Sequence, residues 1–292
     1  MASFQTVGII AKLQDDRVQP AVREVCEILA ELGCRVLLEE LPGAAETPPT
    51  AERVPFESMR REIDLLVVVG GDGTLLRAGR RLDGNPIPLL GIHHGRLGFL
   101  VDIRPDELRN ALHGVMSGEY RIENRITLSA TITGSEHTRG PYPAINDVVI
   151  RNQDAVRMIE FETWLDDEFI SVHRADGFIV STPTGSTAYA MSSGGPVIHP
   201  GLEALAMIPV CPHTLSDRPV LVPADHTIKV VLIGGHNDRA MMTCDGQVNE
   251  SLLAGETLHI SSSTLHLKLV HPNSYRYFTV LRDKLNWGRS WT

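Results

Sequence analysis

The chain has 292 residues, of which 42% are hydrophobic and 22% charged, as is ordinary for a globular protein long enough for two domains. It carries 36 acidic and 27 basic residues, a formal net charge of -9, which argues against nucleic-acid or membrane-surface binding. No apolar run reaches the roughly 18 residues of a membrane span, and the first residues lack the basic region of an export signal. The four cysteines form no zinc or C-x-x-C pattern, so we expect reduced thiols and a cytoplasmic protein.

Strand and helix patterns alternate over the first part of the chain. Short apolar runs predict strands at 7–13, 35–40, 65–69 and 87–92. Apolar residues at helical spacing predict helices at 20–32 and 105–116. Residues 41–55 are rich in Pro, Ala and Glu and are expected to form a surface loop. The alternation predicts a doubly wound α/β domain over residues 1–120.

The pattern changes after Tyr120, where strand-like segments follow one another with turn signals and almost no helix. These segments lie at 126–133, 144–150, 158–165, 169–173, 178–182, 226–233, 240–244, 257–261 and 265–270. Asp166-Asp167 is expected to be a hairpin turn, and Asp245-Gly246 a second turn. We predict a mostly antiparallel β domain over residues 121–274. The last segment, 275–292, is expected to be a helix that packs back on the first domain.

The stretch 65–76, which reads L-L-V-V-V-G-G-D-G-T-L-L, organises the first domain. Its apolar half predicts a strand buried on both faces, and Thr74 opens a segment with helical spacing. Gly70, Gly71 and Gly73 lie between them, where they can take positive φ and let a ligand approach the backbone. Strand, glycine turn and helix start together aim backbone N–H groups and a helix dipole at phosphate.

Asp72 stands in the middle of this turn, where a carboxylate needs its own explanation because the turn suits an anion. One interpretation is structural: Asp72 caps the helix or accepts hydrogen bonds from turn amides. The other is chemical: Asp72 removes the proton of an attacking hydroxyl group or binds a metal ion. The sequence leaves these interpretations open.

Two further stretches are more polar than a fold requires. G-R-L-G-F-L at 95–100 is either a strand-to-loop bend with a solvated Arg96 or part of a site. Asn146 and Asp147 stand inside the apolar segment A-I-N-D-V-V-I, where adjacent strand residues face opposite sides. We therefore expect one of them to point inward or into a cleft, where an amide and a carboxylate suit ribose hydroxyls or an adenine edge. A bulge or an edge strand is the alternative explanation.

The segment 173–196, H-R-A-D-G-F-I-V-S-T-P-T-G-S-T-A-Y-A-M-S-S-G-G-P, is the richest in polar side chains. Arg174 and Asp176 precede a buried strand, and the hydroxyl-rich loop after that strand offers donors and acceptors to sugar and phosphate oxygens. A solvated linker is the alternative, which the apolar residues within the loop disfavour. The histidines form no recognisable metal-ligand set, and no Walker A, G-x-G-x-x-G or G-x-S-x-G motif is present.

The motifs G-G-D-G-T, G-R-L-G-F-L, A-I-N-D-V-V-I and R-A-D-G-F-I-V-S-T-P-T-G-S-T-A-Y together resemble those of bacterial NAD kinases in content, order and spacing. G-G-D-G alone also occurs in phosphofructokinases and in diacylglycerol and sphingosine kinases, so the longest motif is the specific part. The resemblance extends from about Val7 to the C-terminal helix. It implies an α/β N-terminal domain, a β-sandwich-like NAD-binding domain, and an active site in the cleft between them.

The resemblance also implies a reaction: transfer of the ATP γ-phosphoryl group to the 2′-hydroxyl of the adenosine ribose of NAD, giving NADP and ADP. A divalent cation, expected to be Mg²⁺, would assist, although no ligand for it is assigned. Asp72 matches the proposed general base. Phosphate or ATP contacts are expected at Gly70, Gly71, Gly73, Thr74 and Arg77. NAD contacts are expected at Asp72, Gly73, Asn146, Asp147, Arg157, Arg174, Asp176, Thr187, Ala188, Tyr189, Ala190, Met191, Ser192 and Gln247. A homodimer or homotetramer is expected.

Two positions depart from the family pattern. Asp147 stands where the family usually has Glu, so the carboxylate is one methylene shorter and the cleft is tighter or a water molecule intervenes. His93 stands where the family tends to have Asn, which affects the local turn. Two other functions compete. A lipid or sugar kinase of the G-G-D-G kind is one, although a lipid kinase needs a membrane-docking face that the sequence lacks. A non-catalytic dinucleotide sensor is the other, and the presence of Asp72 counts against it.

Overall fold

The computed structural model describes residues 3–11, 17–41, 47–82, 84–94, 98–101, 103–135, 137–153, 158–234 and 239–288. The chain divides into two compact units. Unit 1 comprises Met1–Asn124 and Leu267–Thr292, and unit 2 comprises Arg125–His266. Within the described residues, no helix has the length and apolar character needed to cross a membrane.

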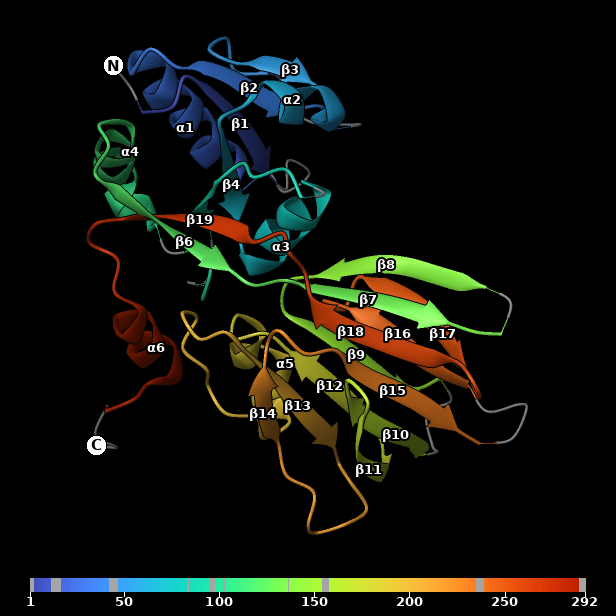
Figure 1. The fold of residues 1–292 in the computed structure, drawn as a ribbon. Helices are drawn as coiled ribbons and strands as arrows, with labels where there is room; N and C mark the ends of the chain where they lie inside the picture. Colours follow the sequence, from blue (N-terminus) through green and yellow to red (C-terminus); the bar gives the residue numbers. More distant parts are fainter. Residues whose placement is uncertain are drawn as a thin grey trace. The chain divides into compact units, whose positions relative to one another are not determined.

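Unit 1 is built on a seven-stranded sheet with the order β3-β2-β1-β4-β5-β19-β6 (Figure 1). Its strands are β1 (Thr6–Ala11), β2 (Arg35–Glu39), β3 (Glu52–Val54), β4 (Leu65–Gly70), β5 (Leu89–His93), β6 (Tyr120–Arg125) and β19 (Leu267–Pro272). The neighbours β2, β1, β4 and β5 run parallel, as an alternation of strands and helices requires. Every residue of β4 is buried, which confirms the expectation from its unbroken apolar run.

Helices cover both faces of this sheet. They are α1 (Gln19–Glu31), α2 (Phe56–Glu62), α3 (Asp72–Arg81), η1 (Pro105–Glu107) and α4 (Leu108–Met116). Val7 and Ile9 of β1 share one hydrophobic cluster with the buried residues of α1 and α4. Gly8, between them, faces the other way: a Cβ there would lie 2.8 Å from Ile63 and 3.0 Å from Met59 of α2. Unit 1 is therefore the expected doubly wound α/β fold.

Four elements of unit 1 differ from the sequence prediction, one of them β6, which no predicted strand covered and which extends this sheet beyond residue 120. The loop expected over 41–55 contains β3, a three-residue strand at the sheet edge with no buried residue, and α2 follows with only Phe56 and Met59 buried. Such short elements leave little hydrophobic periodicity to detect. The strand pattern at 265–270 is confirmed as β19, but β19 pairs in parallel with β5 in unit 1 and not with the strands that precede it. A strand pattern does not identify its partner.

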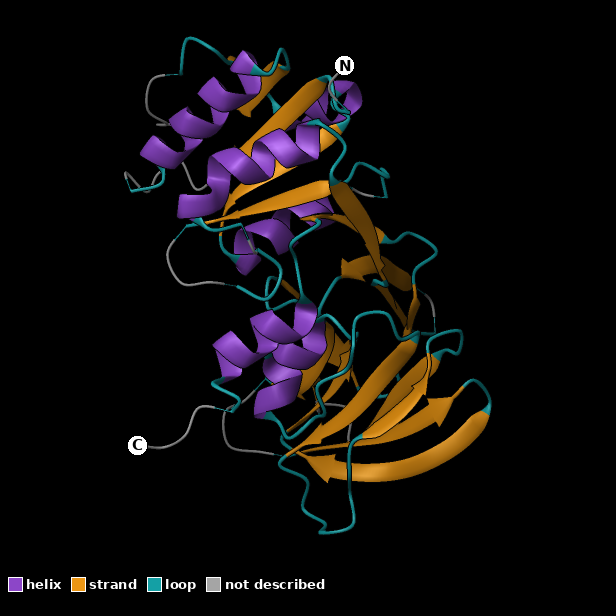
Figure 2. Ribbon diagram, turned by 90° about the vertical axis from the view of Figure 1, so that its left-hand side faces the viewer, coloured by secondary structure: helices purple, strands orange, loops and turns teal. Residues whose placement is uncertain are grey.

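Unit 2 consists of two six-stranded sheets, and strands dominate it (Figure 2). One sheet has the order β11-β10-β15-β18-β7-β8 and the other β14-β13-β12-β9-β16-β17. The strands of the first are β7 (Leu128–Thr133), β8 (Thr138–Ala144), β10 (Ile159–Leu165), β11 (Glu168–Ala175), β15 (Ile228–Ile233) and β18 (Thr257–Ser262). Those of the second are β9 (Asp147–Asn152), β12 (Gly177–Ser181), β13 (Ala204–Val210), β14 (Val220–Pro223), β16 (Arg239–Cys244) and β17 (Val248–Leu253).

The two sheets of unit 2 share one core, which contains the fully buried Phe161 of the first sheet and Phe178 of the second, 5.2 Å apart between ring centroids. Their strands pair antiparallel, so the largely antiparallel β domain is confirmed. Asp166-Asp167 forms the expected hairpin turn, since Leu165 pairs with Glu168. The sequence prediction missed β8, β13, β14 and β17; β8 contains one glycine and two prolines, which mask a strand pattern.

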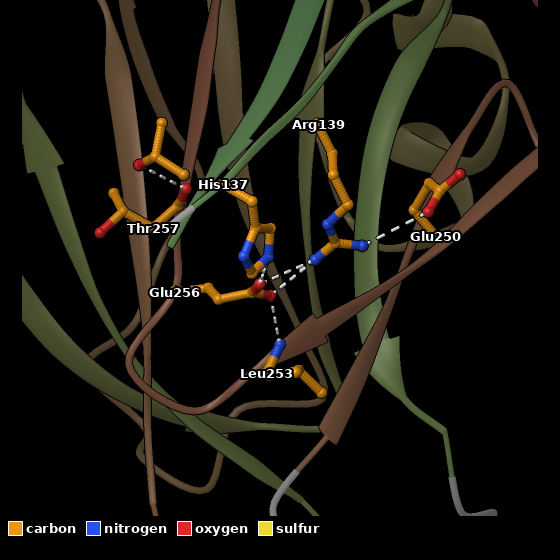
Figure 3. A network of polar contacts seen from close by, with 7 residues as sticks. His137, Arg139, Glu250, Leu253, Glu256 and Thr257 are labelled. Atoms are coloured by element: carbon orange, nitrogen blue, oxygen red, sulfur yellow. Dashed lines mark hydrogen bonds and ion pairs between the residues drawn. The ribbon is translucent and has the colours of Figure 1, made fainter. Parts of the chain in front are cut away.

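A network of polar contacts joins the two sheets at one edge of unit 2 (Figure 3). Arg139 of β8 donates to both oxygens of Glu256, at 2.9 and 2.7 Å, and its other terminal nitrogen lies 3.4 Å from Glu250 of β17. His137 and the Leu253 N–H also contact the Glu256 carboxylate, at 2.9 and 2.8 Å. Burial favours a higher pKa for Glu256, but these hydrogen bonds and the Arg139 charge outweigh it and lower the pKa.

The C-terminal helix α6 (Tyr277–Leu285) groups with unit 1, as the sequence analysis expected. Lys284 of α6 lies 5.5 Å from the ring centroid of Phe99, a residue in the loop that follows β5. Val280 and Leu281 are the buried residues of this helix.

Candidate active site

The turn after β4 is the first part of the candidate site, and it lies in unit 1. Gly71 is extended, with φ -111° and ψ -179°, and α3 begins at the next residue. The Gly71 carbonyl accepts hydrogen bonds from the N–H groups of Thr74 and Leu75, at 2.9 and 3.2 Å. The amides of Asp72 and Gly73 precede these donors, in the first turn whose N–H groups have no acceptor within a helix. Together with the helix dipole they favour a bound anion.

The glycines of this turn act differently from the sequence expectation. None of Gly70, Gly71 and Gly73 has positive φ, so the turn does not depend on a left-handed residue. Gly70 is required for another reason: a Cβ there would lie 2.8 Å from the Thr74 hydroxyl oxygen. A Cβ on Gly71 or Gly73 would meet nothing within 4 Å. These two glycines therefore keep space open beside the helix start, and the Arg77 side chain is exposed on the same helix.

Asp72 is the first residue of α3, and its carboxylate binds a second turn of the chain. It accepts hydrogen bonds from the N–H groups of Phe99 at 2.8 Å, Leu100 at 3.1 Å and Val101 at 3.2 Å. The N-cap residue of α3 is Gly71, which provides no side-chain capping hydrogen bond. The structural interpretation of Asp72 is thus correct in part: it accepts turn amides, but those of a segment 27 to 29 residues away.

Gly98 explains part of the motif at 95–100. A Cβ at Gly98 would collide with the Asp72 carboxylate, so this position needs a glycine for as long as Asp72 occupies its place. The earlier residues of the motif, 95–97, with Arg96 among them, lie outside the described residues. The last residues of the motif therefore hold the Asp72 carboxylate in place: Phe99 and Leu100 donate hydrogen bonds to it, and Gly98 leaves room for it.

The second part of the candidate site lies in unit 2, at the start of β9. Asp147 is the first residue of this strand, and Asn146 precedes it. The sequence prediction placed them inside a strand, but Ile145 and Asn146 form a bend between β8 and β9. β9 is a central strand, which excludes the edge-strand explanation. The Asn146 side-chain oxygen is buried and has no hydrogen-bond partner in the part of the chain that the structure describes. Asp147 is 5% exposed.

The segment after β12 is fastened to this bend. Thr182 donates from its backbone N–H to the Asn146 carbonyl at 2.9 Å and from its hydroxyl to the Ile145 carbonyl at 2.7 Å. The same hydroxyl accepts the Gly185 N–H at 3.1 Å. A Cβ on Gly185 would collide with the Asn146 backbone. The turn around Gly185 is therefore held directly against the Asn146–Asp147 pair.

The predicted NAD contacts at 187–192 continue from this turn. They span the end of η2 (Gly185–Thr187) and the short helix α5 (Tyr189–Ser192). Ala190 is buried and packs in one cluster with Val149 of β9 and Ile198. Tyr189 is 47% exposed, and Thr187, Ala188 and Met191 are partly exposed. This segment is a folded cover on the outer face of the second sheet, which argues against the solvated-linker explanation.

Asp245 completes this part of the site, although its sequence pattern indicated only a turn residue. It lies between β16 and β17 with φ 49°, and its carboxylate accepts the N–H groups of Ile145, Asn146 and Asp147. Gln247, the predicted contact in the same turn, is exposed. The sequence D-G-Q at 245–247 indicates a turn. A turn pattern does not reveal which backbone N–H groups donate hydrogen bonds to the aspartate.

Arg174 and Asp176 lie elsewhere in unit 2. β12 has five residues, which is roughly 16 Å of strand, and Asp176 precedes it while Thr182 follows it. Both Arg174 and Asp176 are exposed. The structure therefore does not bring them together with the Asn146–Asp147 pair. Arg157 lies outside the described residues.

In the second part of the site, the carboxyl group of Asp147 has a raised pKa. Burial first, and the charge of Asp245 second, raise the pKa of Asp147 to about 7. A carboxyl group with such a pKa exchanges its proton at neutral pH, which is a property of binding and catalytic sites more often than of structural ones.

The site residues form no cluster of metal ligands within the described residues, and a pocket in unit 1 is lined by other residues. Among the described residues, no three His, Cys, Asp or Glu side chains lie close enough to hold a metal ion by themselves. Mg²⁺ is usually held by one or two carboxylates together with substrate phosphates, so the residues present fit a cation that arrives with a nucleotide. A pocket of about 550 Å³ lies between α4 and the segment from β19 to α6. None of the predicted site residues lines it.

Comparison with known proteins identifies relatives over nearly the whole chain. The model of the ATP-NAD kinase N-terminal domain matches residues 7–120, and that of the ATP-NAD kinase C-terminal domain matches residues 145–272. The NAD kinase of Teredinibacter turnerae is 40% identical over 293 residues, which cover 99% of this chain and 98% of that protein. The NAD kinase of Ectopseudomonas mendocina is 42% identical over 289 residues, with the same coverage of 99% and 98%.

Two solved structures share the fold. A yeast NADH kinase complexed with NADH superposes with a TM-score of 0.85 at 23% identity, over 99% of this chain and 89% of that one, and this likeness concerns the fold alone. An NAD kinase from Archaeoglobus fulgidus in complex with ATP has a TM-score of 0.75 at 27% identity, over 97% of this chain and 99% of that one.

Proposed function

The chain belongs to the NAD kinase family, and we propose that it transfers the γ-phosphoryl group of ATP to the 2′-hydroxyl of the adenosine ribose of NAD, forming NADP and ADP. The structural observation that carries this proposal is the bend at Asn146 and Asp147. It is fixed by hydrogen bonds on both sides, yet it keeps a buried side-chain oxygen and a buried carboxyl without partners among the described residues. Ribose hydroxyls supply the hydrogen bonds that such groups lack.

The turn after β4 is proposed to bind the phosphates. Phosphoryl transfer needs positioning and neutralisation of charge more than covalent help from the protein. The first-turn amides of α3 and the space beside Gly71 and Gly73 suit phosphate oxygens. The Thr74 hydroxyl and the exposed Arg77 are proposed to add a hydrogen bond and a positive charge.

Asp72 is proposed as the general base that accepts the proton of the 2′-hydroxyl. A carboxylate has about four lone-pair sites, and the amides of Phe99, Leu100 and Val101 occupy three. The amides hold the carboxylate in one orientation and leave a lone pair for the substrate. A carboxylate so held needs no reorganisation when the reaction begins.

A divalent cation, expected to be Mg²⁺, would be bound through the triphosphate, with Asp72 as the carboxylate placed to share it. When bound, the cation neutralises the negative charge that accumulates on the phosphoryl oxygens. The protein residues perform the other tasks: the turn holds the phosphates, and Asp72 receives the hydroxyl proton.

Unit 2 is proposed to bind NAD. Asn146 and Asp147 are proposed to hold the adenosine ribose. The segment 187–192 and Gln247 are proposed to line the edges of the same site. Arg174, Asp176 and Arg157 are proposed as further substrate contacts. A dinucleotide has two nucleosides joined by a pyrophosphate, so contacts at both ends of β12 suit a ligand of that length.

One experiment tests this function against its competitors. The protein is incubated with Mg-ATP and, in separate reactions, with NAD, NADH, a diacylglycerol or fructose 6-phosphate, and products are identified by mass. We expect a phosphate adduct on NAD. Transfer to the lipid or the sugar with none to NAD would overturn the proposal. Binding of NAD without turnover would favour a dinucleotide sensor.

Two further properties are part of the proposal: a homodimer or homotetramer, and a cytoplasmic location. The cysteines are consistent with this location, because Cys26, Cys34, Cys211 and Cys244 form no disulfide among the described residues. Sedimentation velocity over a range of concentrations tests the assembly. A single species with the mass of one chain at all concentrations would contradict it.

A further inference from the structure

Asp245 joins two segments of unit 2 that are about a hundred residues apart in the sequence. Its carboxylate accepts the N–H groups of Asn146 at 2.7 Å, Ile145 at 3.0 and 3.1 Å, and Asp147 at 3.2 Å. Its own backbone N–H donates to the Asp147 carbonyl at 3.0 Å. The bend before β9 is therefore held to the β16–β17 turn by side chain and backbone at once, and its three consecutive amides converge on one carboxylate.

The side chains of the bend are left available by this arrangement. The Asn146 oxygen is buried with no partner among the described residues. Asp147 lies on the same face of β9 as Val149, because side chains alternate along a strand. Val149 packs against Ala190 and Ile198, so this face is the one that the segment after β12 covers. No hydrogen bond to the Asp147 carboxyl is present within the described part of the chain, although its side chain is almost completely buried.

We propose that Asp245 is a positioning residue of the NAD site, which presents Asn146 and Asp147 to the ribose and controls the charge of Asp147 when NAD binds. This inference rests on the proposed function, because it names NAD as the ligand of the bend. Asp245 acts through the bend and does not itself touch the ribose.

The charge around Asp147 supports this role. Burial and Asp245 together raise the pKa of Asp147 to about 7. On the β12 side its partner in register is Ser181, which does not titrate at neutral pH. Cys244 of β16 points into the core between the sheets. The buried cation of this region, Arg125, donates to the Thr184 hydroxyl at 3.4 Å and does not lower the pKa of Asp147.

A dependence of NAD binding on pH follows, and its sign can be derived. Ribose hydroxyls donate hydrogen bonds, so they favour the ionised form of Asp147. Because the pKa of Asp147 is about 7, its carboxyl group is protonated in the free protein below pH 7 and must lose a proton when NAD binds. Affinity for NAD therefore increases as the pH rises through 7. For a pKa of about 7, the dissociation constant at pH 6 is expected to be about tenfold that at pH 8.

The test is isothermal titration of NAD into the full-length protein without ATP, at pH 6, 7 and 8 and in buffers of different ionisation enthalpy. Asp245→Asn keeps an oxygen for the three amides, since one carboxylate oxygen accepts all of them, and removes the charge. Asp147→Asn removes the titrating group. Asp166→Asn is the matched control, because Asp166 is also a turn aspartate with positive φ that accepts a backbone amide.

Four results are expected. The unmodified protein and Asp166→Asn show the tenfold change between pH 6 and 8 and release about half a proton per NAD at pH 7. Asp245→Asn shows a change of less than tenfold, because removal of the neighbouring charge lowers the pKa of Asp147, although burial, the larger cause, still raises it. Asp147→Asn binds more weakly at every pH and releases no proton.

A uniform loss of affinity in Asp245→Asn, with the tenfold change retained, would make Asp245 merely structural and overturn the proposal. If Asp245→Asn does not fold, the proton count decides: equal release from the unmodified protein and Asp147→Asn would also overturn it. Failure of the proposed function is a separate outcome, since the unmodified protein would then form no NADP in the mass assay.

Discussion

Two aspartates, one in each unit, perform the same structural task in different surroundings. Asp72 accepts the amides of residues 99–101, and Asp245 accepts those of residues 145–147. In both cases one carboxylate collects three consecutive N–H groups of a distant bend. Such charge-assisted hydrogen bonds are stronger than neutral ones and fix the bend in one conformation.

The difference lies in what stands beside each carboxylate. Asp72 is at the start of α3, next to the open space at Gly71 and Gly73, so a phosphate and a hydroxyl can approach it. Asp245 is in a tight turn, and its neighbour is another carboxyl group, Asp147, whose pKa it helps to raise. We propose that the same device serves proton transfer in unit 1 and the presentation of binding groups in unit 2.

The largest expected effect belongs to Asp72→Asn. Removal of a general base costs about 10²–10⁴ in rate, so we expect kcat to fall at least about a hundredfold. We also expect the variant to be less stable. The amide NH₂ of asparagine must replace one carboxylate oxygen, either the one that accepts the Phe99 N–H at 2.8 Å or the one that accepts the N–H groups of Leu100 and Val101. We expect about 1–2 kcal/mol less stability by chemical denaturation, and a change in NAD binding by titration that is much smaller than the change in kcat.

Asp64→Asn is the matched control for this variant. Asp64 also accepts two backbone amides in unit 1, from Gln5 at 2.7 Å and Thr6 at 3.2 Å, and it has no part in the proposed chemistry. It should lose stability while keeping a normal kcat. A normal kcat in Asp72→Asn as well would return Asp72 to a structural role. Recovery of activity at high Mg²⁺ would make Asp72 a metal ligand and not a base.

Gly185→Ala tests the second bend from its opposite side. The new methyl group would collide with the Asn146 backbone, so the bend or the turn after β12 must move. We expect KM for NAD to rise at least about tenfold with KM for ATP unchanged, and stability to fall by about 1–3 kcal/mol. Gly114→Ala on α4 is the control, because its Cβ would be 3.7 Å from the nearest atom. Equal changes in both KM values would show that unit 2 is not specific to NAD.

The sequence was sufficient to predict the elements that carry strong local signals. β4 is an unbroken apolar run, and the turn at Asp166-Asp167 separates two alternating strands, so both follow from local rules. The partner of β19 and the amides that Asp245 accepts are contacts between distant segments, which leave no periodic trace. The expectation of positive φ at the glycine turn was wrong. A side chain at Gly70 would collide with Thr74, and the absence of side chains at Gly71 and Gly73 leaves open space.

Glu256 of unit 2 is a carboxylate whose partners are the side chains of Arg139 and His137 and not a proposed substrate. Its folded pKa is lowered, so its stabilising contribution is complete above its unfolded pKa of about 4.3 and is lost as the pH falls through the lower folded value. Glu256→Gln should cost about 2–3 kcal/mol at pH 7 and reduce the loss of stability between pH 6 and 3, measured by chemical denaturation. The same pH dependence in the variant would show that Glu256 does not contribute to acid unfolding.

The smallest expected effect on the fold belongs to Gly73→Ala, and it sharpens the interpretation of the open space beside Asp72. A Cβ at Gly73 would meet nothing within 4 Å, and the residue lies in the first turn of α3. Alanine favours a helix over glycine by up to about 1 kcal/mol, so stability should rise by about 0.5 kcal/mol. If the space belongs to phosphate oxygens, the methyl group obstructs them and KM for ATP should rise several-fold while NAD binding is unchanged. A stabilised variant with an unchanged KM for ATP would contradict the assignment of this space to phosphate.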